Sequence, residues 1–483
     1  MRILVLFFLL FFGINTFSQN YFRRVIGGLG EDYGNTVVLT DDNGFLIGGS
    51  SSSYNISNSD AIIFKLDSVG NTQWFKTYGG SQQESAKYMI KDFDGNFVFT
   101  GYTSSFGNGS YDVYLVKINS NGDTLFTKTF GGSDWEEGNH IIQLQDSSYI
   151  ISGYTFSYGA GAKDAYLLKV SKEGNLIWSK TFGYQNNEEI FETIELKNDT
   201  SIICVGFTNS IGNGLNDGWA IKVDDDGNQE WEITSGQAFD DEFKTIAYIN
   251  NHFSILGNTR SYSNDSNWDE ILTIIDQSGN ISNILVEQLN LDDYITRMIV
   301  GDNEDHVFTG YTNGFGGGKN DMYCKIFTKN FAYINGPTMG EAENEIGRDL
   351  KRTNDKGYII VGNTNSFGDK GYQNIYVVKN DSTNSSPRYS EVITVNIIDL
   401  EKNDIKIYPN PFSSYFTIES ENLNNESRVE LYDFSGKRII QYSTQYFNNR
   451  LLVKSEELEN GIYFLRVILN NDKIGFSKLI LNK

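Results

Sequence analysis

A segment of about 52 residues recurs along this chain, and this repeat constrains the fold more than any other feature. Residues 75–126 and 127–178 align without a gap. One marker glycine recurs at steps of 52, 52, 53, 51, 53 and 52 residues, at Gly49, Gly101, Gly153, Gly206, Gly257, Gly310 and Gly362. Because self-similarity at such a period is the signature of stacked arrays, we expect seven copies of one structural unit.

Each copy predicts four β-strands joined by tight turns. In the second copy these strands span residues 86–91, 96–103, 111–118 and 124–130. Asp94-Gly95 and Asn121-Gly122 provide the positive-φ residues that hairpins require. The strand Phe97–Tyr102 is apolar on both sides, which favours burial of both faces. A four-stranded sheet that repeats at this length and is covered by its neighbours is a propeller blade, so we predict an all-β, seven-bladed β-propeller over residues 19–380.

The two ends of the array indicate how the ring closes. The fourth-strand motif occurs once before the first full copy, at residues 23–28. The seventh copy runs into a polar stretch after Tyr376–Lys379 and has no fourth strand of its own. We therefore expect residues 21–28 to complete the last blade, which removes the exposed edges of an open array. Residues 391–398 are the alternative closing strand.

The first 18 residues have the pattern of a signal peptide. Arg2 gives a positive start, residues 3–12 are apolar, and the small residues Thr16 and Ser18 precede a predicted cut before Gln19. The apolar run is too short to span a bilayer, and we expect no transmembrane segment in the rest of the sequence. The net charge of −23 opposes binding to nucleic acid or anionic lipid. We predict a protein that is secreted, or held at the outer cell surface, after passage through the periplasm.

Two acidic positions recur in the predicted ring. The first precedes the first strand of each copy and is occupied by Asp32, Glu84, Glu136, Glu188, Asp241, Asp293 and Glu345. The second opens the third strand and is occupied by Asp60, Asp112, Asp164, Asp217, Asp269, Asp321 and, in the last copy, Asn374. Alternating strand directions place both positions on the face that carries the long loops. Such carboxylates can bind calcium or act as an acid–base pair, but sevenfold repetition favours side chains that cap their own loops.

Two tryptophans break the repeat and are the candidates for ligand contact. Trp135 lies in the loop before the first strand of the third copy, and Trp268 lies in the divergent loop of the fifth copy, residues 260–269. A ligand site on a ring of similar blades should use residues that differ between blades. Exposed aromatic side chains stack on sugar rings or anchor protein partners, whereas buried ones pack beneath a loop.

Catalytic and metal-binding motifs are absent from the sequence. The histidines, His140, His252 and His306, lack the spacing of a metal site. Cys204 and Cys324 lie in apolar runs that predict burial. We therefore predict no catalytic residue and no cofactor, with calcium the one ion to consider. A non-catalytic binding or adhesion module is the leading hypothesis, and a secreted glycosidase or lyase and a structural surface component are the alternatives.

Residues 404–483 contain short alternating strands and no trace of the repeat. Their landmarks are Tyr408, Pro409, Asn410 and Pro411, then Gly436 and Lys437, then Gly461 and Tyr463. In this order, these motifs resemble the type A C-terminal sorting domain of the type IX secretion system of Bacteroidota. An ordinary Ig-like sandwich used for binding is the alternative. Residues 21–380 resemble the propeller repeats of secreted bacterial and archaeal proteins, a resemblance specific for fold and silent on activity.

The resemblance of the C-terminal region implies a small Ig-like β-sandwich that serves as an export address. Its partners would be the type IX secretion machinery and a sortase-like peptidase that removes the domain. The expected region of cleavage is the linker, residues 381–403, after which the ring is released or attached to lipopolysaccharide. An extracellular polysaccharide or protein is the other partner expected, and a closed ring is expected to be monomeric.

Overall fold

The computed structural model describes residues 21–481, except 29, 55–57, 197–198, 250, 263–266, 288–290, 369–370, 387–391, 397–405, 421–422, 424–427, 434–437, 443–449, 455–457, 459–460 and 469–473. The predicted signal peptide lies outside the described residues. Within them the regular secondary structure is β-strand, apart from one helical segment, the short 3₁₀ turn Asp302–Glu304. No helix in this part is long and apolar enough to cross a membrane. The chain divides into two compact units between Thr394 and Val395, with residues 26–29 assigned to the second.

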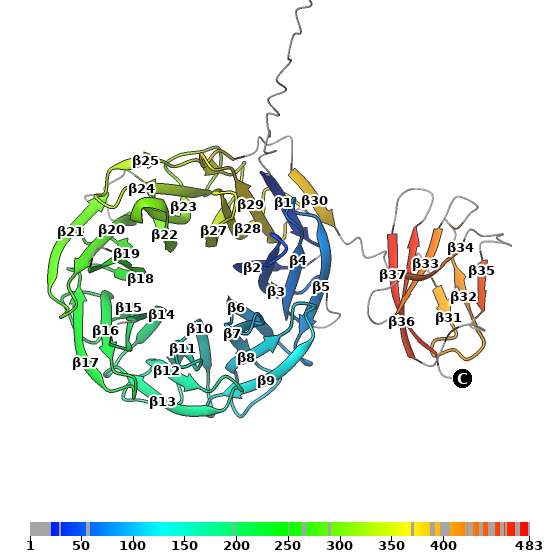
Figure 1. Ribbon diagram of the computed structural model, residues 1–483, viewed down its shortest axis with the longest axis horizontal. Coiled ribbons are helices and arrows are strands. Elements are labelled where there is room, and N and C mark those ends of the chain that lie inside the picture. Colours follow the sequence, from blue (N-terminus) through cyan, green and yellow to red (C-terminus); the bar gives the residue numbers. More distant parts are fainter. Residues whose placement is uncertain are drawn as a thin grey trace, which may run out of the picture. The chain divides into compact units, whose positions relative to one another are not determined.

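Seven sheets of the described residues form a ring in which the first strand of each sheet lies nearest the centre (Figure 1). The first three blades are β2 (Asp32–Leu39), β3 (Phe45–Ser51), β4 (Asp60–Leu66) and β5 (Thr72–Tyr78); β6 (Glu84–Lys91), β7 (Phe97–Thr103), β8 (Asp112–Ile118) and β9 (Thr124–Phe130); and β10 (Glu136–Gln143), β11 (Tyr149–Thr155), β12 (Asp164–Val170) and β13 (Leu176–Phe182). The next three are β14 (Glu188–Leu196), β15 (Ser201–Thr208), β16 (Asp217–Val223) and β17 (Gln229–Ser235); β18 (Asp241–Ile249), β19 (His252–Thr259), β20 (Asp269–Ile275) and β21 (Ile281–Glu287); and β22 (Asp293–Val300), β23 (His306–Thr312), β24 (Asp321–Phe327) and β25 (Tyr333–Asn335), with β26 (Thr338–Met339) beside β24.

The seventh blade combines strands from distant parts of the chain. Its order is β27 (Glu345–Arg352), β28 (Tyr358–Thr364), β29 (Asn374–Asn380), β1 (Phe22–Gly27) and β30 (Val392–Asn396). The N-terminal strand therefore occupies the fourth place, and the alternative closing segment adds a fifth strand outside it. Arg24 of β1 also donates hydrogen bonds to the carbonyl oxygens of Gly70 (2.9 Å) and Val69 (2.7 Å), which connects β1 to the first blade.

The hydrophobic core of the ring lies between neighbouring blades. All seven residues of β8 are buried, whereas the outer strand β9 has only exposed and half-buried residues. One core cluster joins Val38 and Leu46 of the first blade to Met89 and Phe99 of the second. Each sheet is thus covered by its neighbours, as strands apolar on both sides require, and the predicted all-β propeller fold is confirmed.

A β-bulge recurs in the innermost strand of every blade, between its third and fifth residues. In the second blade Ala86 pairs with Gly101 and Tyr88 pairs with Thr100, which leaves Lys87 unpaired between them. The same register shift occurs in the innermost strands of the other six blades. A β-carbon on the marker glycine Gly101 would overlap the carbonyl oxygen of Ser85. The marker glycine therefore repeats because the bulge needs a close backbone approach there.

The second unit is a sandwich of two antiparallel sheets. One sheet has the order β31 (Lys406–Tyr408), β32 (Tyr415–Glu419) and β35 (Arg450–Lys454), and the other has β34 (Arg438–Tyr442), β33 (Arg428–Asp433), β36 (Gly461–Ile468) and β37 (Ile474–Leu481). Phe416 and Ile418 of the first sheet share one core with Val429 and Leu465 of the second. This agrees with the small β-sandwich expected for the C-terminal region.

Candidate functional site

The first repeated acidic position is buried and bound by its own loop. All seven side chains at this position are 0% or 1% exposed. The carboxylate of Glu136 accepts hydrogen bonds from the Thr155 hydroxyl (2.7 Å) and from the backbone N–H groups of Ser157 (3.1 Å) and Gly132 (2.7 Å). Glu84 has the equivalent three partners one blade earlier. These carboxylates satisfy loop N–H groups that would otherwise be left without partners.

The second repeated acidic position caps the long loop between the second and third strands. Asp164 accepts hydrogen bonds from the backbone N–H groups of Ala160 (3.2 Å) and Gly161 (3.0 Å). In the last blade the side-chain amide of Asn374 instead donates to the carbonyl oxygens of Phe367 (3.1 Å) and Tyr372 (3.3 Å). Asparagine therefore closes the same loop with the direction of the hydrogen bond reversed.

The two acidic positions meet between blades, on either side of a repeated glycine. A β-carbon on Gly131 would overlap the carboxylate of Asp112, from the second blade, and that of Glu136, from the third. The same arrangement surrounds Gly79, Gly183, Gly236 and Gly340. Burial raises the pKa of Asp112, and the neighbouring charge of Glu136 adds to the increase. The glycine and the two carboxylates thus form one unit of the repeat.

Cysteine and histidine contribute no metal centre in the described part of the chain. There, no group of three or more His, Cys, Asp or Glu side chains is arranged to hold a metal ion. Cys204 and Cys324 are buried as predicted, and burial raises the pKa of each thiol to about 12. His306 is 1% exposed, and its ring lies 4.6 Å from that of Phe331.

Trp135 lies on the long-loop face, at the junction of the second and third blades. It is 37% exposed, and its ring centroid lies 4.6 Å from that of Tyr111 and 6.3 Å from that of Tyr154. The Tyr154 hydroxyl donates a hydrogen bond to Glu137 on the innermost strand β10 (3.0 Å). An aromatic path therefore leads from this tryptophan towards the centre of the ring.

Trp268 occupies the corresponding junction of the fifth and sixth blades. Its ring centroid lies 5.6 Å from that of Tyr294, edge to face, and 5.6 Å from the guanidinium carbon of Arg260. The Tyr294 hydroxyl donates a hydrogen bond to Glu242 on the innermost strand β18 (2.8 Å). Trp135 is partly exposed and Trp268 is half-buried. Each packs against a tyrosine whose hydroxyl donates a hydrogen bond to a glutamate on an innermost strand.

A cluster of charged and polar side chains on the ring axis was missed by motif reasoning. It comes from the fifth residue of each innermost strand, which is Thr36, Tyr88, His140, Glu192, Thr245, Arg297 or Asp349. All seven are 9% exposed or less. The axial cluster is defined here as Tyr88, His140, Glu192, Arg297, Asp349 and Lys351, the last lying two residues after Asp349. The signal was one column of the aligned repeats whose residue type varies from blade to blade.

Contacts within the axial cluster join blades that are not neighbours. Nη1 of Arg297 lies 2.9 Å from Oε1 of Glu192, and the Arg297 guanidinium lies 4.4 Å from the ring centroid of Tyr88. Nζ of Lys351 lies 2.7 Å from Oδ1 of Asp349 and 3.3 Å from the Tyr88 hydroxyl. These contacts connect the sixth blade to the fourth and second, and the seventh to the second. They therefore cross the axis of the ring.

Burial sets the protonation of the axial cluster. The ring of His140 lies 4.2 Å from that of Tyr88, and its Nδ1 accepts a hydrogen bond from the backbone N–H of Thr193 (3.3 Å). Burial, reinforced by the charge of Arg297, holds the pKa of His140 well below its usual value, so this imidazole is neutral. Burial also raises the pKa of Glu192, against the opposing effect of Arg297. The groups able to move protons are packed against one another in the interior.

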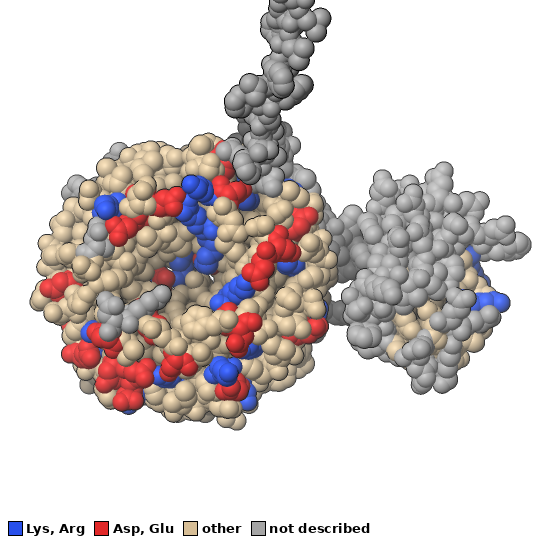
Figure 2. Space-filling view, viewed as in Figure 1, with Lys and Arg blue, Asp and Glu red and all other residues tan. Residues whose placement is uncertain are grey.

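Ion pairs line the hollow nearer the long-loop face. Three of them are Lys87–Glu137 (2.7 Å), Lys163–Glu189 (2.5 Å) and Lys244–Glu242 (2.6 Å). Figure 2 shows Lys and Arg atoms inside the hollow at the centre of the ring. Although the chain carries a net charge of −23, cations therefore lie at the centre of the ring, and those of these three pairs are matched by carboxylates.

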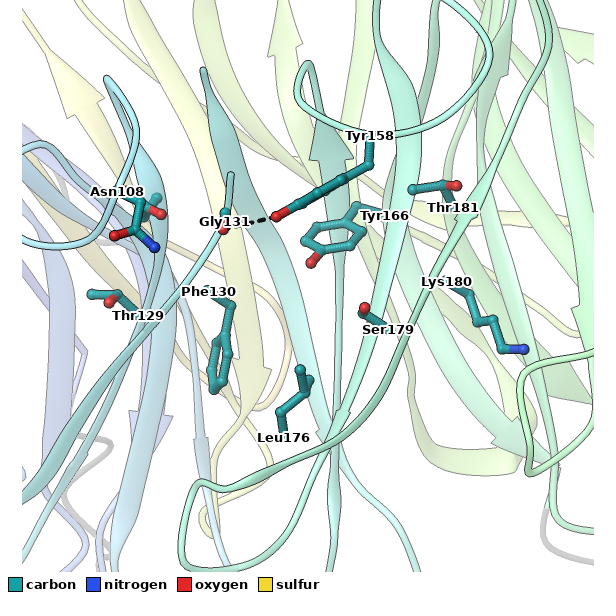
Figure 3. Close-up of a pocket in the computed structure, with 11 residues that line it drawn as sticks. Asn108, Thr129, Phe130, Gly131, Tyr158, Tyr166, Leu176, Ser179, Lys180 and Thr181 are labelled. Carbon is teal, nitrogen blue, oxygen red and sulfur yellow. Dashed lines mark hydrogen bonds between the residues drawn. The ribbon is translucent and has the colours of Figure 1, made fainter. Parts of the chain in front are cut away.

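Two cavities between the outer strands repeat with the blades. One, of about 470 Å³, is lined by Tyr158 and Tyr166, and the Tyr158 hydroxyl donates to the carbonyl oxygen of Gly131 (3.0 Å; Figure 3). The other, of about 520 Å³, is lined by Phe106 and Tyr114, 52 positions earlier. Because the linings correspond, these cavities are a property of the blade junction.

A third cavity, of about 270 Å³, lies between the fifth and sixth blades. Its lining includes Glu270, which is 4% exposed and lies 2.9 Å from Nζ of Lys325. The equivalent residues in five other blades are Ala61, Val113, Ala165, Gly218 and Met322. Burial raises the pKa of Glu270 to about 8, despite the opposing charge of Lys325.

The motif residues of the second unit lie at the start of its first sheet and in β36. Tyr408 ends β31 and its hydroxyl donates to Glu419 on β32 (2.5 Å). Pro409 and Pro411, on either side of Asn410, each follow a cis peptide bond. Gly461 and Tyr463 lie in β36, whereas Gly436 and Lys437 lie outside the described residues.

Residues 406–482 match the family model of the secretion system C-terminal sorting domain. This segment is a type IX sorting domain. The chain is therefore exported to the cell surface or the extracellular space, as the sequence predicts. A search of curated proteins gives no match. The sorting domain identifies the route of the chain and leaves the role of the ring open.

Solved structures similar to this chain serve different functions. PorZ, a surface component of the type IX secretion system of Porphyromonas gingivalis, has 10% identity and a TM-score of 0.41, and the match covers 92% of this chain and 59% of PorZ. The β-propeller domain of the Trilobed protease from Pyrococcus furiosus has 12% identity and a TM-score of 0.43, with 77% and 99% covered. A fungal alcohol oxidase has 8% identity and a TM-score of 0.42, with 96% and 100% covered. With scores below 0.5, these likenesses carry no argument about activity.

Proposed function

We propose that this chain is an exported, non-catalytic binding module whose ligand surface surrounds the central hollow on the long-loop face. One observation carries the proposal. Repeated positions such as Glu136 and Asp164 are buried and bonded to loop N–H groups, whereas the fourth residue of the innermost strand differs between blades and is half-buried or exposed, as at Lys87 and Arg348. Specificity needs such differences, because seven equivalent blades cannot by themselves define one site.

The burial of the axial cluster favours binding over catalysis at the centre of the ring. Three groups there with acid–base chemistry, Tyr88, His140 and Glu192, are each 9% exposed or less. A general acid or base must come within hydrogen-bond reach of the proton that it transfers. These three side chains instead lie beneath the surface that a ligand would contact.

Binding should be tested with the full mature chain against a panel of immobilised polysaccharides and glycans. The assay measures retention on each ligand and the release of new reducing ends. We expect retention without release, and at least fivefold weaker retention for Trp135→Ala or Trp268→Ala. Tyr333→Ala is the matched control, because Tyr333 is 59% exposed on the outer strand β25. Retention that neither tryptophan variant changes would place the site elsewhere.

A secreted carbohydrate-active enzyme is the second candidate, and the cavity beside Glu270 is what favours it. A carboxyl group with a raised pKa in an apolar cavity has the character of a general acid. The same panel separates the candidates, because an enzyme would release reducing ends and Glu270→Gln would abolish that release. Release that survives Glu270→Gln would exclude this cavity as the active site.

We also propose that export follows the type IX route of Bacteroidota and ends in removal of the sorting domain. The match over residues 406–482 supports the route, and the predicted linker 381–403 supplies the site of cleavage. Deletion of 406–482 should leave the protein inside the cell envelope, as measured by surface protease digestion and blotting of the medium. Mass spectrometry of the secreted form should find a mature start at Gln19 and an end within 381–403. A secreted form that retains residues 406–482 would contradict the cleavage.

A further inference from the structure

Arg348 is an exposed cation in the hollow that takes part in no hydrogen bond or ion pair of the described structure. It is the fourth, bulged residue of β27, one residue nearer the long-loop face than Asp349 of the axial cluster. A guanidinium group that lacks a carboxylate partner can bind an anion, because its charge is permanent and its five N–H donors are fixed in a plane.

Comparison with the other blades explains why Arg348 has no partner. The bulged residue commonly reaches the second residue of the next blade's innermost strand, as in the pairs Lys87–Glu137 (2.7 Å) and Asn139–Glu189 (2.9 Å). The blade that follows the seventh around the ring is the first, and the second residue of its innermost strand, β2, is Tyr33. A tyrosine therefore lies where other blades have a carboxylate, so Arg348 has no carboxylate at this position with which to form an ion pair.

Three tyrosines provide the surroundings of Arg348. Tyr33, Tyr294 and Tyr311 all lie close enough to act on its charge, and Tyr294 and Tyr311 stack with ring centroids 5.2 Å apart. Burial raises the pKa of each of these phenols, so their hydroxyls stay protonated, and those of Tyr33 and Tyr294 donate to Glu31 and Glu242. Desolvation lowers the pKa of Arg348 from 12.5, yet a guanidinium remains charged in water near neutral pH.

The other charged groups nearby form no ion pair with Arg348 among the described residues. The charge of Arg348 acts on Lys87, whose own charge is balanced by Glu137. Glu31 lies beside Tyr33, whose hydroxyl is 3.4 Å away, and its carboxylate accepts a hydrogen bond from the backbone N–H of Gln373 (3.0 Å). Arg348 therefore has no carboxylate in direct contact and is surrounded by tyrosines.

We propose that Arg348 binds the carboxylate of an acidic sugar residue while Tyr33 and Tyr311 contact the sugar ring. A planar guanidinium matches a carboxylate with two parallel hydrogen bonds. Trp268, Tyr294 and Tyr311 form an aromatic path inward from the rim, with neighbouring centroids 5.6 and 5.2 Å apart, and Tyr294 and Tyr311 lie within electrostatic reach of Arg348. Aromatic faces suit the C–H faces of a pyranose, so an acidic glycan fits better than an acidic peptide. This assignment rests on the proposed binding function and names its ligand class.

The test measures binding of a galacturonate hexamer to the full mature chain by calorimetry at low and moderate salt. The same hexamer with methyl-esterified carboxyl groups keeps every sugar ring and removes the charge. Arg348→Gln removes the cation, and Arg348→Lys keeps the charge but loses the planar fork. Lys319→Gln is the matched control, because its side chain is 67% exposed and loses the same charge. A sulfated galactan hexamer and polyglutamate test the other sources of negative charge.

We expect the hexamer to bind with an affinity that falls at least tenfold in Arg348→Gln and on esterification, less in Arg348→Lys and not at all in Lys319→Gln. Equal binding of the esterified hexamer, or unchanged binding by Arg348→Gln, would overturn the proposal. Tighter binding of polyglutamate or of the sulfated galactan would overturn the assignment to a sugar carboxylate. If the polysaccharide panel shows retention on neutral glycans alone, this inference fails while the binding function stands. If the panel shows no retention at all, both fail.

Discussion

Replacing Arg297 with methionine should destabilise the whole ring, because it leaves one carboxylate buried without a cation. Glu192 is 6% exposed, and Arg297 is its partner at 2.9 Å. His140 cannot take over, because its pKa lies well below the usual value, and Lys351 is already paired with Asp349 at 2.7 Å. Breaking a buried ion pair from one side costs about 3–5 kcal/mol, so we expect a loss of that size in the free energy of unfolding.

A double-mutant cycle tests whether the loss comes from the stranded charge. In Arg297→Met with Glu192→Met both charges are gone, and similar changes elsewhere have been neutral or stabilising, so the double variant should be more stable than Arg297→Met. Urea unfolding of the full mature chain can be followed by tryptophan fluorescence, since Trp219 is only 1% exposed. A loss below about 1 kcal/mol, the worth of an exposed pair, would refute the reasoning.

The pH dependence of Arg297→Met provides an independent check on the same charge. Burial already raises the folded-state pKa of Glu192 above the ordinary value of 4.5. Without Arg297 this pKa rises further, so the folded state holds a proton that the unfolded state releases. Stability of the variant is then greatest below pH 4.5 and is lost as the pH rises through the folded-state pKa. The difference in the free energy of unfolding between wild type and variant should therefore become smaller in acid. A difference that becomes larger there would point to another cause.

Three further predictions concern the ring. Deletion of residues 21–27 removes Val25 and Ile26, both 0% exposed, and should cost at least about 4 kcal/mol in urea unfolding; an unchanged midpoint would show that β1 does not close the ring. Gly131→Ala forces a methyl group between Asp112 and Glu136 and should lower the free energy of unfolding by about 1–3 kcal/mol. Gly317→Ala is the control and should be nearly neutral, because its β-carbon would meet one atom at 3.8 Å. Equal effects of the two variants would exclude the proposed crowding at Gly131. Burial raises the folded-state pKa of Glu270 to about 8 from the ordinary value of 4.5, so the free energy of unfolding should decline between these pH values and Glu270→Gln should reduce the decline. A free energy of unfolding that rises over this interval would contradict the assignment.

The repeat was enough to predict the architecture, because each blade is specified by local patterns. Runs that are apolar on both sides, such as Phe97–Tyr102, require burial of both faces, and Asp-Gly and Asn-Gly turns set the hairpins. The surplus strand at residues 23–28 pointed to the fourth place of the last blade, where β1 lies. The sorting domain was recognisable because its motifs lie in a fixed order along the chain.

The axial cluster could not be assembled from spacing, because its members come from different copies. Arg297 and Glu192 are separated by two blade lengths, yet their side chains are 2.9 Å apart across the axis. The same is true of Lys351 and Tyr88, which lie at opposite ends of the array and 3.3 Å apart. Closing the ring brings such residues together, so only the tertiary structure could reveal the contact.

The sequence alone determined the blade count, the strand order within a blade, and the export address. These depend on the period of hydrophobic residues, on turn residues and on short motifs, all of which are local. Only the tertiary structure decided which repeated carboxylates are loop caps, and that Arg348 is left unpaired. Both facts depend on the neighbouring blade, because a bulge aims each side chain at the next strand around the ring and Tyr33 stands where another blade has a glutamate.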